Sequence, residues 1–223
     1  MTKKLFFQAI GKFVFGLVFV ALLLFLPAGT LRFWNGWLFI GILFLPISIT
    51  GIVMMIRNPE LLKKRLNAKE KQKEQKTVIF LSGLMFVAAF IVAGLNFRFS
   101  WIVLPDWLVY TASGIFVAAY LMYVEVLREN EYLSRTVEVQ KNQKVIDTGL
   151  YGIVRHPMYF ATLFLFLSMG LVLGSPISFV IMLFYIPIIV KRINNEEKIL
   201  AQGLEGYEEY RKKVKYRIIP FIW

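Results

Sequence analysis

The sequence predicts an all-α, polytopic integral membrane protein with about six membrane segments, including a short helical hairpin near the C-terminus. Three observations predict this class. Of the 223 residues, 58% are hydrophobic and only 18% are charged, whereas soluble domains are about one quarter charged. Long uncharged runs cover about half of the chain. The lysines and arginines gather in alternate loops between these runs, as in proteins that follow the positive-inside rule.

The first four apolar runs are each long enough to cross a bilayer. A helix needs about 20 apolar residues for this, and each run carries at most one charged residue. The first run has a basic start like that of a signal peptide, but its apolar part is longer and a small-x-small cleavage site is not evident, so we expect an anchor. The four runs are residues 5–26, 33–56, 78–97 and 107–127.

Two shorter apolar runs follow, at residues 159–174 and 177–190. The turn-like sequence Gly174-Ser175-Pro176 separates them, so we expect a helical hairpin. Because each arm is shorter than a full span, the hairpin is expected to be sheltered by the other helices or to reach the interface at both ends.

The basic residues predict the orientation of the chain. Of the 26 lysines and arginines, 24 lie in the loops that would face one side or at the start of the first span on that side, and only Arg32 and Arg98 lie in the alternate loops. We therefore expect both termini in the cytoplasm, at the inner membrane if the source is prokaryotic. The basic segment 57–76 is expected to be mainly a solvated cytoplasmic linker, with Leu61, Leu62 and Leu66 available for the headgroup surface.

Composition also excludes several kinds of site. The chain has no cysteine, which excludes disulfides and thiolate metal sites, and its single histidine excludes a multi-histidine metal centre. The net charge of +12 is explained by retained cytoplasmic loops, so we expect the lipid bilayer as a partner, and neither nucleic acid nor metal.

Polar residues concentrate after residue 127, which divides the chain into four N-terminal spans (1–127) and a polar C-terminal core (128–223). In this core, the stretch 143–159 reads Q-K-V-I-D-T-G-L-Y-G-I-V-R-H-P-M-Y. Pro157 suits the first turn of a helix, and the free amides there, with Arg155 and His156, predict a site for an anion such as a carboxylate. The alternative is an ordinary helix start, with His156 as a cap or interfacial residue.

A second polar cluster, 191–197, follows the hairpin. Arg192 and Glu196 are four residues apart and share a helix face, and the hairpin returns them to the side of His156. A guanidinium, a carboxylate and an imidazole are therefore expected to converge; the alternative is a surface ion pair between Arg192 and Glu196. Glu125 is expected to snorkel to the interface, or to pair with Arg128 or a nearby lysine. The aromatic residues of the tail are expected to anchor it at the interface, more readily than to stack on nucleic acid; they are Tyr207, Tyr210, Tyr216 and Trp223.

Four ordered motifs resemble the isoprenylcysteine carboxyl methyltransferase family, and related phospholipid N-methyltransferases share part of the pattern. The motifs are T-G-L-Y-G-I-V-R-H-P-M-Y (148–159), E-E-K-I-L (196–200), Y-E-E-Y-R-K-K-V (207–214) and I-P-F-I-W (219–223). The resemblance covers roughly residues 128–223, whereas the first four spans match in hydropathy alone.

The resemblance implies S-adenosylmethionine bound at the cytoplasmic side, and a lipophilic small-molecule or prenylated acceptor. It assigns acceptor binding to Arg192 and places Glu196 in the catalytic site. Two positions depart from the pattern: Gln143 stands where eukaryotic members have histidine, and Ala161 where glycine is usual. The implied cofactor contacts are Gln143, Lys144, Val145, Ile146, Tyr151, His156, Pro157, Met158, Tyr159 and Glu196.

The implied activity is carboxyl O-methylation of an isoprenylcysteine-like acceptor. A carboxylate is ionised at neutral pH and needs no general base, whereas an amine would have to lose a proton, to His156 or Glu196. Three alternatives remain open: N-methylation of a phospholipid or small amine, a non-catalytic membrane protein that keeps the fold, and a nicotinamide-dependent reductase of similar topology. For the last, the sequence has no G-x-G-x-x-G motif.

Overall fold

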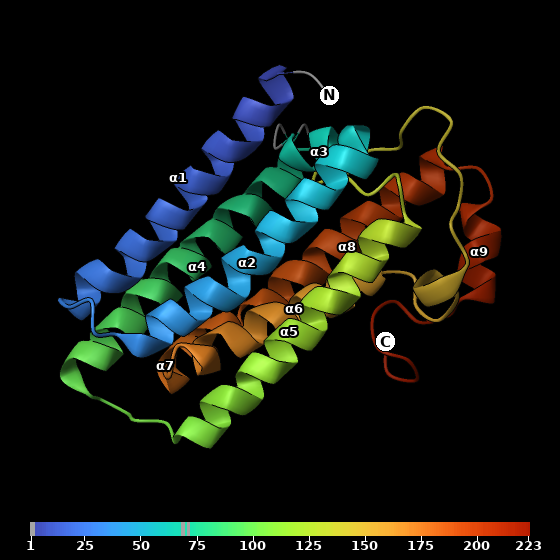
Figure 1. The fold of residues 1–223 in the computed structure, drawn as a ribbon. Helices are drawn as coiled ribbons and strands as arrows, with labels where there is room; N and C mark the ends of the chain where they lie inside the picture. Colours follow the sequence, from blue (N-terminus) through green and yellow to red (C-terminus); the bar gives the residue numbers. More distant parts are fainter. Residues whose placement is uncertain (1–2, 68–69, 71) are drawn as a thin grey trace.

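The computed structural model describes residues 3–67, 70 and 72–223, and it folds them into one elongated helical bundle (Figure 1). In the described part of the chain, regular structure is helical throughout, which confirms the all-α prediction. The elements are α1 (Lys3–Ala28), α2 (Trp34–Arg57), α3 (Pro59–Leu66), α4 (Lys73–Phe99), α5 (Asp106–Glu129), the 3₁₀ turn η1 (Gly149–Gly152), α6 (Pro157–Val172), α7 (Pro176–Met182), α8 (Tyr185–Gly203) and α9 (Tyr207–Lys213).

The membrane segments agree with the apolar runs. Five helical stretches are long and apolar enough to cross a bilayer, namely α1, α2, α4, α5 and the stretch Pro176–Gly203 that joins α7 to α8. The shorter apolar helix α6 is the sixth segment. The prediction of a polytopic membrane protein with about six segments is thereby confirmed.

The C-terminal hairpin has one short arm and one long arm. The first arm, α6, ends at Val172, and the turn contains Gly174 at φ +69° and Ser175, whose hydroxyl accepts from the amide of Ser178 at 3.2 Å. The second arm does not end with the apolar run at residue 190, because α8 continues to Gly203. Ile189 and Ile193 are buried on the same face as Glu197, so one buried stripe extends α8 from apolar into polar sequence.

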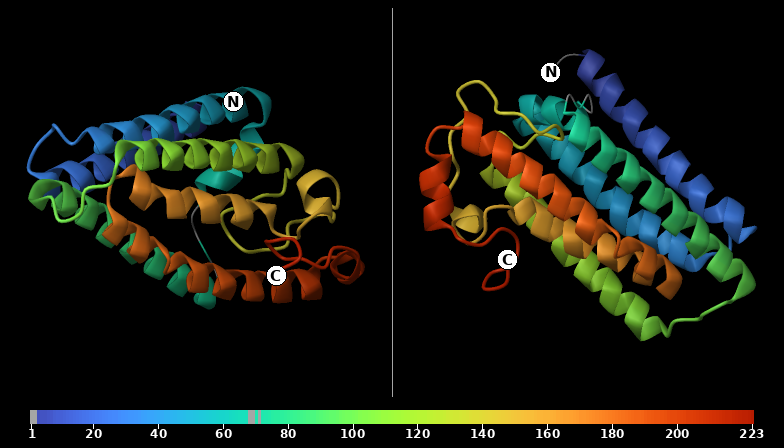
Figure 2. Two further views of the ribbon diagram at one scale, coloured as in Figure 1. Left: turned by 90° about the horizontal axis from the view of Figure 1, so that it is seen from below. Right: turned by 180° about the vertical axis from the view of Figure 1, so that it is seen from behind.

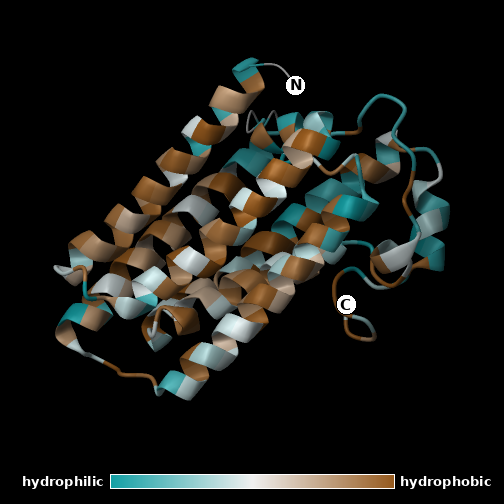
Figure 3. Ribbon diagram, in the orientation of Figure 1, coloured by the Kyte–Doolittle hydropathy of each residue, from teal (hydrophilic) through white to brown (hydrophobic). Residues whose placement is uncertain are grey.

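The two ends of the bundle differ in polarity (Figure 3). One end, which we call the polar end, carries the start of α1, α3, the loop 130–148, η1 and α9; the turns at 29–33, 100–105 and 173–175 lie at the other (Figure 1). Arg32 and Arg98, the two basic residues outside the predicted cytoplasmic loops, belong to that opposite end. The arrangement agrees with the predicted alternation of loops.

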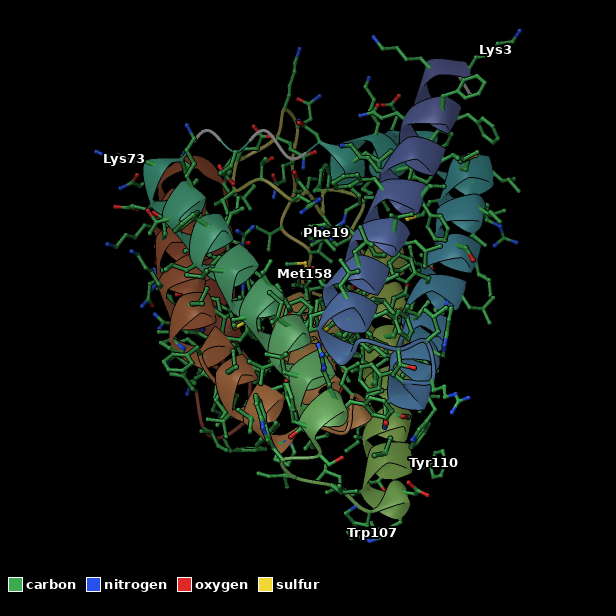
Figure 4. All side chains as sticks on the ribbon, turned by 90° about the vertical axis from the view of Figure 1, so that its left-hand side faces the viewer. Lys3, Phe19, Lys73, Trp107, Tyr110 and Met158 are labelled. Atoms are coloured by element: carbon green, nitrogen blue, oxygen red, sulfur yellow. The ribbon has the colours of Figure 1, made fainter. Side chains whose placement is uncertain are left out.

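Helix α6 lies inside the bundle, packed along α5 and also against α2, α4, α7 and α8 (Figure 2). Helix α4 packs on α1 along one side and on α7 and α8 along the other. Viewed from the α1 side, α1 and α4 converge at one end and diverge toward Lys3 and Lys73 at the polar end, with Met158 visible between them (Figure 4). In this view the start of α6 is seen where α1 and α4 separate (Figure 4).

The segment 57–76 packs on the protein more closely than a solvated linker would. Leu61 and Leu62 of α3 are buried in the protein, so they do not face the headgroup surface. Arg65 donates to the carbonyl of Ser134 at 3.1 Å, which ties α3 to the loop after α5. Three residues of this segment, 68, 69 and 71, lie outside the described residues.

Candidate functional site

A cavity opens at the polar end of the bundle, between the loop 130–146, η1, the first turn of α6, α8 and α9. Its volume is about 830 Å³, including its opening to solvent. Five tyrosines and several charged side chains line it. The lining includes Asn130, Tyr132, Thr136, Glu138, Gln143, Lys144, Val145, Ile146, Tyr151, Arg155, His156, Met158, Tyr159, Arg192, Glu196, Tyr207 and Tyr210.

The cavity gathers nearly all the residues assigned from the sequence. Gln143, Lys144, Val145, Ile146, Tyr151, His156, Met158, Tyr159, Glu196 and Arg192 all line it. Pro157 does not: it is the first residue of α6 and is fully buried beneath the wall, where its fixed φ favours the start of the helix. The side chain of Gln143 is engaged locally, since its carbonyl oxygen accepts from the amide of Gln140 at 2.8 Å.

Tyr159 joins Arg192 to Glu196. Arg192 donates from Nε to the Tyr159 hydroxyl at 2.9 Å, and that hydroxyl donates to the Glu196 carboxylate. Arg192 also donates to Gln75 Oε1 at 3.0 Å and to the carbonyl of Arg135 at 2.8 Å. Arg192 and Glu196 thus share a helix face, as predicted, but a tyrosine lies between them instead of a direct ion pair.

Arg155 and His156 converge on Glu197, the residue after the predicted Glu196. Arg155 Nε lies 2.7 Å and His156 Nε2 3.2 Å from Glu197 Oε1, and Glu197 is only 4% exposed. Arg217 from the tail completes this Glu197 cluster at 3.0 Å. The anion site predicted at Arg155 and His156 is therefore filled by a carboxylate of the protein itself, because a buried guanidinium requires a charged partner.

The same cluster fastens the C-terminal tail to the site. Arg155 donates from Nη1 to the carbonyls of Val214 and Lys215, both at 2.8 Å. The amides of Arg155 and His156 donate to the carbonyls of Tyr216 and Arg217, at 2.9 and 2.8 Å. These contacts hold the tail against the start of α6.

Three buried tyrosines, Tyr151 of η1 and Tyr207 and Tyr210 of α9, form part of the cavity wall. Tyr210 donates to the carbonyl of Tyr151 at 2.8 Å, and the hydroxyl of Tyr151 accepts from Asn130 at 2.9 Å. The hydroxyl of Tyr207 is buried and has no hydrogen-bond partner among the described residues. Burial raises the pKa of each of these hydroxyls, so they are neutral donors at physiological pH. Tyr207 and Tyr210 are thus parts of the cavity wall and not the interfacial anchors that the sequence predicted.

Gly149 is required where η1 meets the end of α5. Its φ is +52°, and a Cβ at this position would lie 1.7 Å from Glu129 Oε1. The Glu129 carboxylate accepts from the amide of Leu150, at 3.2 Å and 3.1 Å to its two oxygens. One turn earlier, Glu125 accepts from Arg128 Nε at 2.8 Å, which confirms the predicted pairing.

The sequence did not assign four of these residues to the site: Gln75, Glu197, Tyr207 and Tyr210. A signal for two of them was present in the helical periodicity. Glu197 lies four residues beyond Ile193 on the buried stripe of α8, and Gln75 continues the buried stripe of α4 through Val78. Among the described residues, no group of three His, Cys, Asp or Glu side chains is arranged to hold a metal ion.

Comparison with known proteins matches the segment that carries most of the cavity. Residues 108–202 match the model of the isoprenylcysteine carboxyl methyltransferase (ICMT) family. The match confirms the family resemblance over α5, the loop, the hairpin and the motif at 196–200. It ends before the tail motifs at 207–214 and 219–223.

Curated relatives that match part of the chain include sterol reductases. A Delta(14)-sterol reductase of Mus musculus is 29% identical over 91 residues, which are 40% of this chain and 22% of that protein. A Delta(14)-sterol reductase of Methylotuvimicrobium alcaliphilum is 30% identical over 93 residues, again 40% and 22% of the two chains. The matched part is thus about a fifth of the length of these relatives. The ICMT match and the apolar helices together support a multi-pass integral membrane protein.

Proposed function

We propose that the protein is an S-adenosylmethionine-dependent methyltransferase that acts on a lipophilic acceptor at the cytoplasmic face of the membrane. Carboxyl O-methylation of an isoprenylcysteine-like acceptor fits the residues best. The observation that carries the proposal is the arrangement at Tyr159, whose hydroxyl connects the Arg192 cation to the Glu196 carboxylate in one cavity wall. Both termini lie in the cytoplasm, and the prokaryotic location would be the inner membrane.

The residues of the cavity suit this cofactor. The unpartnered hydroxyl of Tyr207 offers a buried donor, and Glu196 offers a carboxylate to a cationic group. The cofactor, when bound, supplies a methyl group on a positively charged sulfur. The loop 143–146, with Tyr151, His156, Met158, Tyr159 and Glu196, would hold it, and Pro157 would support that wall from beneath.

Arg192 is suited to bind the carboxylate of the acceptor. An arginine has five N–H donors, and three of those of Arg192 are used on neutral groups. Its two remaining donors can therefore bind a planar anion. An ionised carboxylate needs no general base, so the protein has to align the two reactants and exclude water.

A reductase is the second candidate, because the curated relatives are named Delta(14)-sterol reductases. That reaction would require a nicotinamide cofactor in the same cavity. An N-methyltransferase is less well supported, because its amine acceptor would meet the Arg192 cation and because His156 is engaged with Glu197. A non-catalytic protein would bind neither cofactor.

Equilibrium binding to the purified protein in detergent separates these candidates. We expect saturable binding of S-adenosylmethionine by calorimetry, and weaker binding of NADPH. Labelled methyl transfer should then occur to an N-acetylated S-prenylcysteine, and should be lost with its neutral carboxamide. Tight NADPH binding without S-adenosylmethionine binding would favour the reductase, and transfer to phosphatidylethanolamine alone would favour the amine acceptor.

A further inference from the structure

We infer that Gln75, on the first turn of α4, positions Arg192 for the acceptor, and that its neutral amide keeps the site selective for anionic acceptors. The inference rests on the proposed function, because it takes Arg192 as the residue that binds the acceptor. It assigns a role in acceptor selection to the N-terminal helices, because Gln75 lies on α4. This helix precedes the segment that matches the family, residues 108–202.

The side chain of Gln75 contacts both the guanidinium and the backbone carbonyl of Arg192. The oxygen of the Gln75 amide accepts from Arg192 Nη1 at 3.0 Å, and its nitrogen donates to the Arg192 carbonyl at 3.3 Å. Gln75 is fully buried, with 0% exposure. A buried amide bonded twice to one residue fixes the direction of that guanidinium, because each alternative rotamer would leave a buried polar group unpaired.

The position does not require an amide for packing. Gln75 continues the stripe of Val78, Met85 and Ala89 by which α4 is buried, and an aliphatic side chain would satisfy that contact. A polar residue at the end of an apolar stripe has to be explained by its partner, and both of its hydrogen bonds go to Arg192.

That the Gln75 side chain is uncharged matters as much as its hydrogen bonds. The guanidinium of Arg155, in the wall of the same cavity, is compensated by Glu197 at 2.7 Å. The three groups that accept from Arg192 are a hydroxyl, an amide and a backbone carbonyl, all neutral. A carboxylate at position 75 would occupy the same place and supply the anion that the acceptor is proposed to supply. Selectivity for anionic acceptors therefore depends on a neutral residue here.

The test compares Gln75→Glu and Gln75→Leu with a matched control, Gln72→Glu. Gln72 is exposed just before α4, so its substitution adds the same charge at the same end of the bundle without reaching Arg192. The probes are an N-acetylated S-prenylcysteine and its carboxamide, with binding measured by calorimetry. Arg192→Ala is measured in parallel, as is the affinity for S-adenosylmethionine.

We expect wild type and Gln72→Glu to prefer the carboxylate probe. Gln75→Glu should weaken binding of the carboxylate probe by roughly tenfold or more, because the new carboxylate already pairs with the guanidinium. The affinity for the carboxamide probe should stay unchanged. Gln75→Leu should weaken the carboxylate probe less, because the charge remains but is no longer directed. The affinity for S-adenosylmethionine should change by less than about twofold in both variants.

Two results would overturn the inference, and they differ from failure of the proposed function. If Arg192→Ala loses the carboxylate preference while both Gln75 variants keep it, Gln75 does not position Arg192, and the proposed function stands. If the Gln75 variants weaken S-adenosylmethionine and the carboxylate probe equally, Gln75 serves the fold alone. If Arg192→Ala itself keeps the preference, the proposed role of Arg192 is wrong, and the role of Gln75 falls with it. Gln75→Glu is close in size to wild type, so the test remains decisive if Gln75→Leu does not fold.

Discussion

Glu196 and Glu197 are neighbours in the chain, but their carboxylates face different surroundings. Glu196 reaches the cavity wall and accepts from the Tyr159 hydroxyl. Glu197 points into the protein, where Arg155, His156 and Arg217 surround it. Because successive residues on a helix point about 100° apart, one glutamate is available to ligands and the other to the fold.

This difference predicts that two isosteric substitutions affect different properties, one the stability and the other the binding of the cofactor. Glu197→Gln leaves the buried Arg155 without its anion and should lower the free energy of unfolding by about 3–5 kcal/mol. Glu196→Gln should change stability little and should weaken S-adenosylmethionine binding several-fold. Thermal unfolding in detergent and calorimetry measure the two effects. Similar loss of stability in both variants would contradict the separation.

The hydroxyl of Tyr159 is predicted to matter more than its ring. Tyr159→Phe removes the group between Arg192 and Glu196 and should lower kcat/KM for a carboxylate acceptor by roughly tenfold, as expected for a charge-assisted hydrogen bond. Tyr120→Phe is the control, because it removes the hydroxyl of another buried tyrosine, whose partner is Thr50, outside the cavity. Equal activity losses in the two variants would show that the Tyr159 hydroxyl has no special role.

At the scale of elements, two glycines on α4 have different surroundings. A Cβ at Gly94 would lie 2.5 Å from the carbonyl oxygen of Leu24 in α1, whereas a Cβ at Gly83 would meet nothing within 4 Å. Gly94 therefore allows the close approach of α1 and α4 at the end where they converge (Figure 4). This contact anchors α1, which is otherwise largely exposed along its length.

The same substitution should therefore have opposite effects at these two positions. Gly94→Ala must push α1 from α4 and should cost about 1–3 kcal/mol of stability. Gly83→Ala should leave stability unchanged or raise it slightly, since alanine is the better helix former. Unfolding in detergent under identical conditions measures both. A stable Gly94→Ala variant would mean that α1 can move away without loss.

At the scale of the whole molecule, the polar end is predicted to face the cytoplasm. The chain has no cysteine, so single cysteines can report their side directly. Cysteine at the exposed positions Glu74 and Lys141 should be protected from an impermeant thiol reagent added outside intact cells. Cysteine at Arg32 and Val103 should be labelled from outside. Labelling from outside at Glu74 or Lys141 would show that the polar end faces the opposite side of the membrane.

Much of the fold was predictable because membrane segments obey local rules. An apolar run of about 20 residues must form a helix in lipid, where every backbone amide and carbonyl has to be satisfied within the segment. For this reason the runs at 5–26, 33–56, 78–97 and 107–127 correspond closely to α1, α2, α4 and α5. The hairpin turn at Gly174 was also evident, because glycine and proline mark turns locally.

The sequence predicted those parts of the site whose residues lie close together in the chain or belong to known motifs. The spacing of Arg192 and Glu196 placed them on one face of α8, but it did not reveal the Tyr159 hydroxyl between them. The sequence predicted that His156, Arg192 and Glu196 would converge, yet which of the two glutamates faces His156 depends on the rotation of α8 against α6. Packing alone sets that rotation, because it buries Ile189 and Ile193.

By itself, the sequence determined the helices, their alternation across the membrane and the family motifs, since these depend on local composition and short spacing. The tertiary structure alone decided that Gln75, more than a hundred residues from Arg192, meets its guanidinium, and that Glu197 is the buried carboxylate. Hydrogen bonds and ion pairs between distant segments depend on how helices pack and rotate against one another. That packing is a property of the assembled bundle and not of any one run of residues.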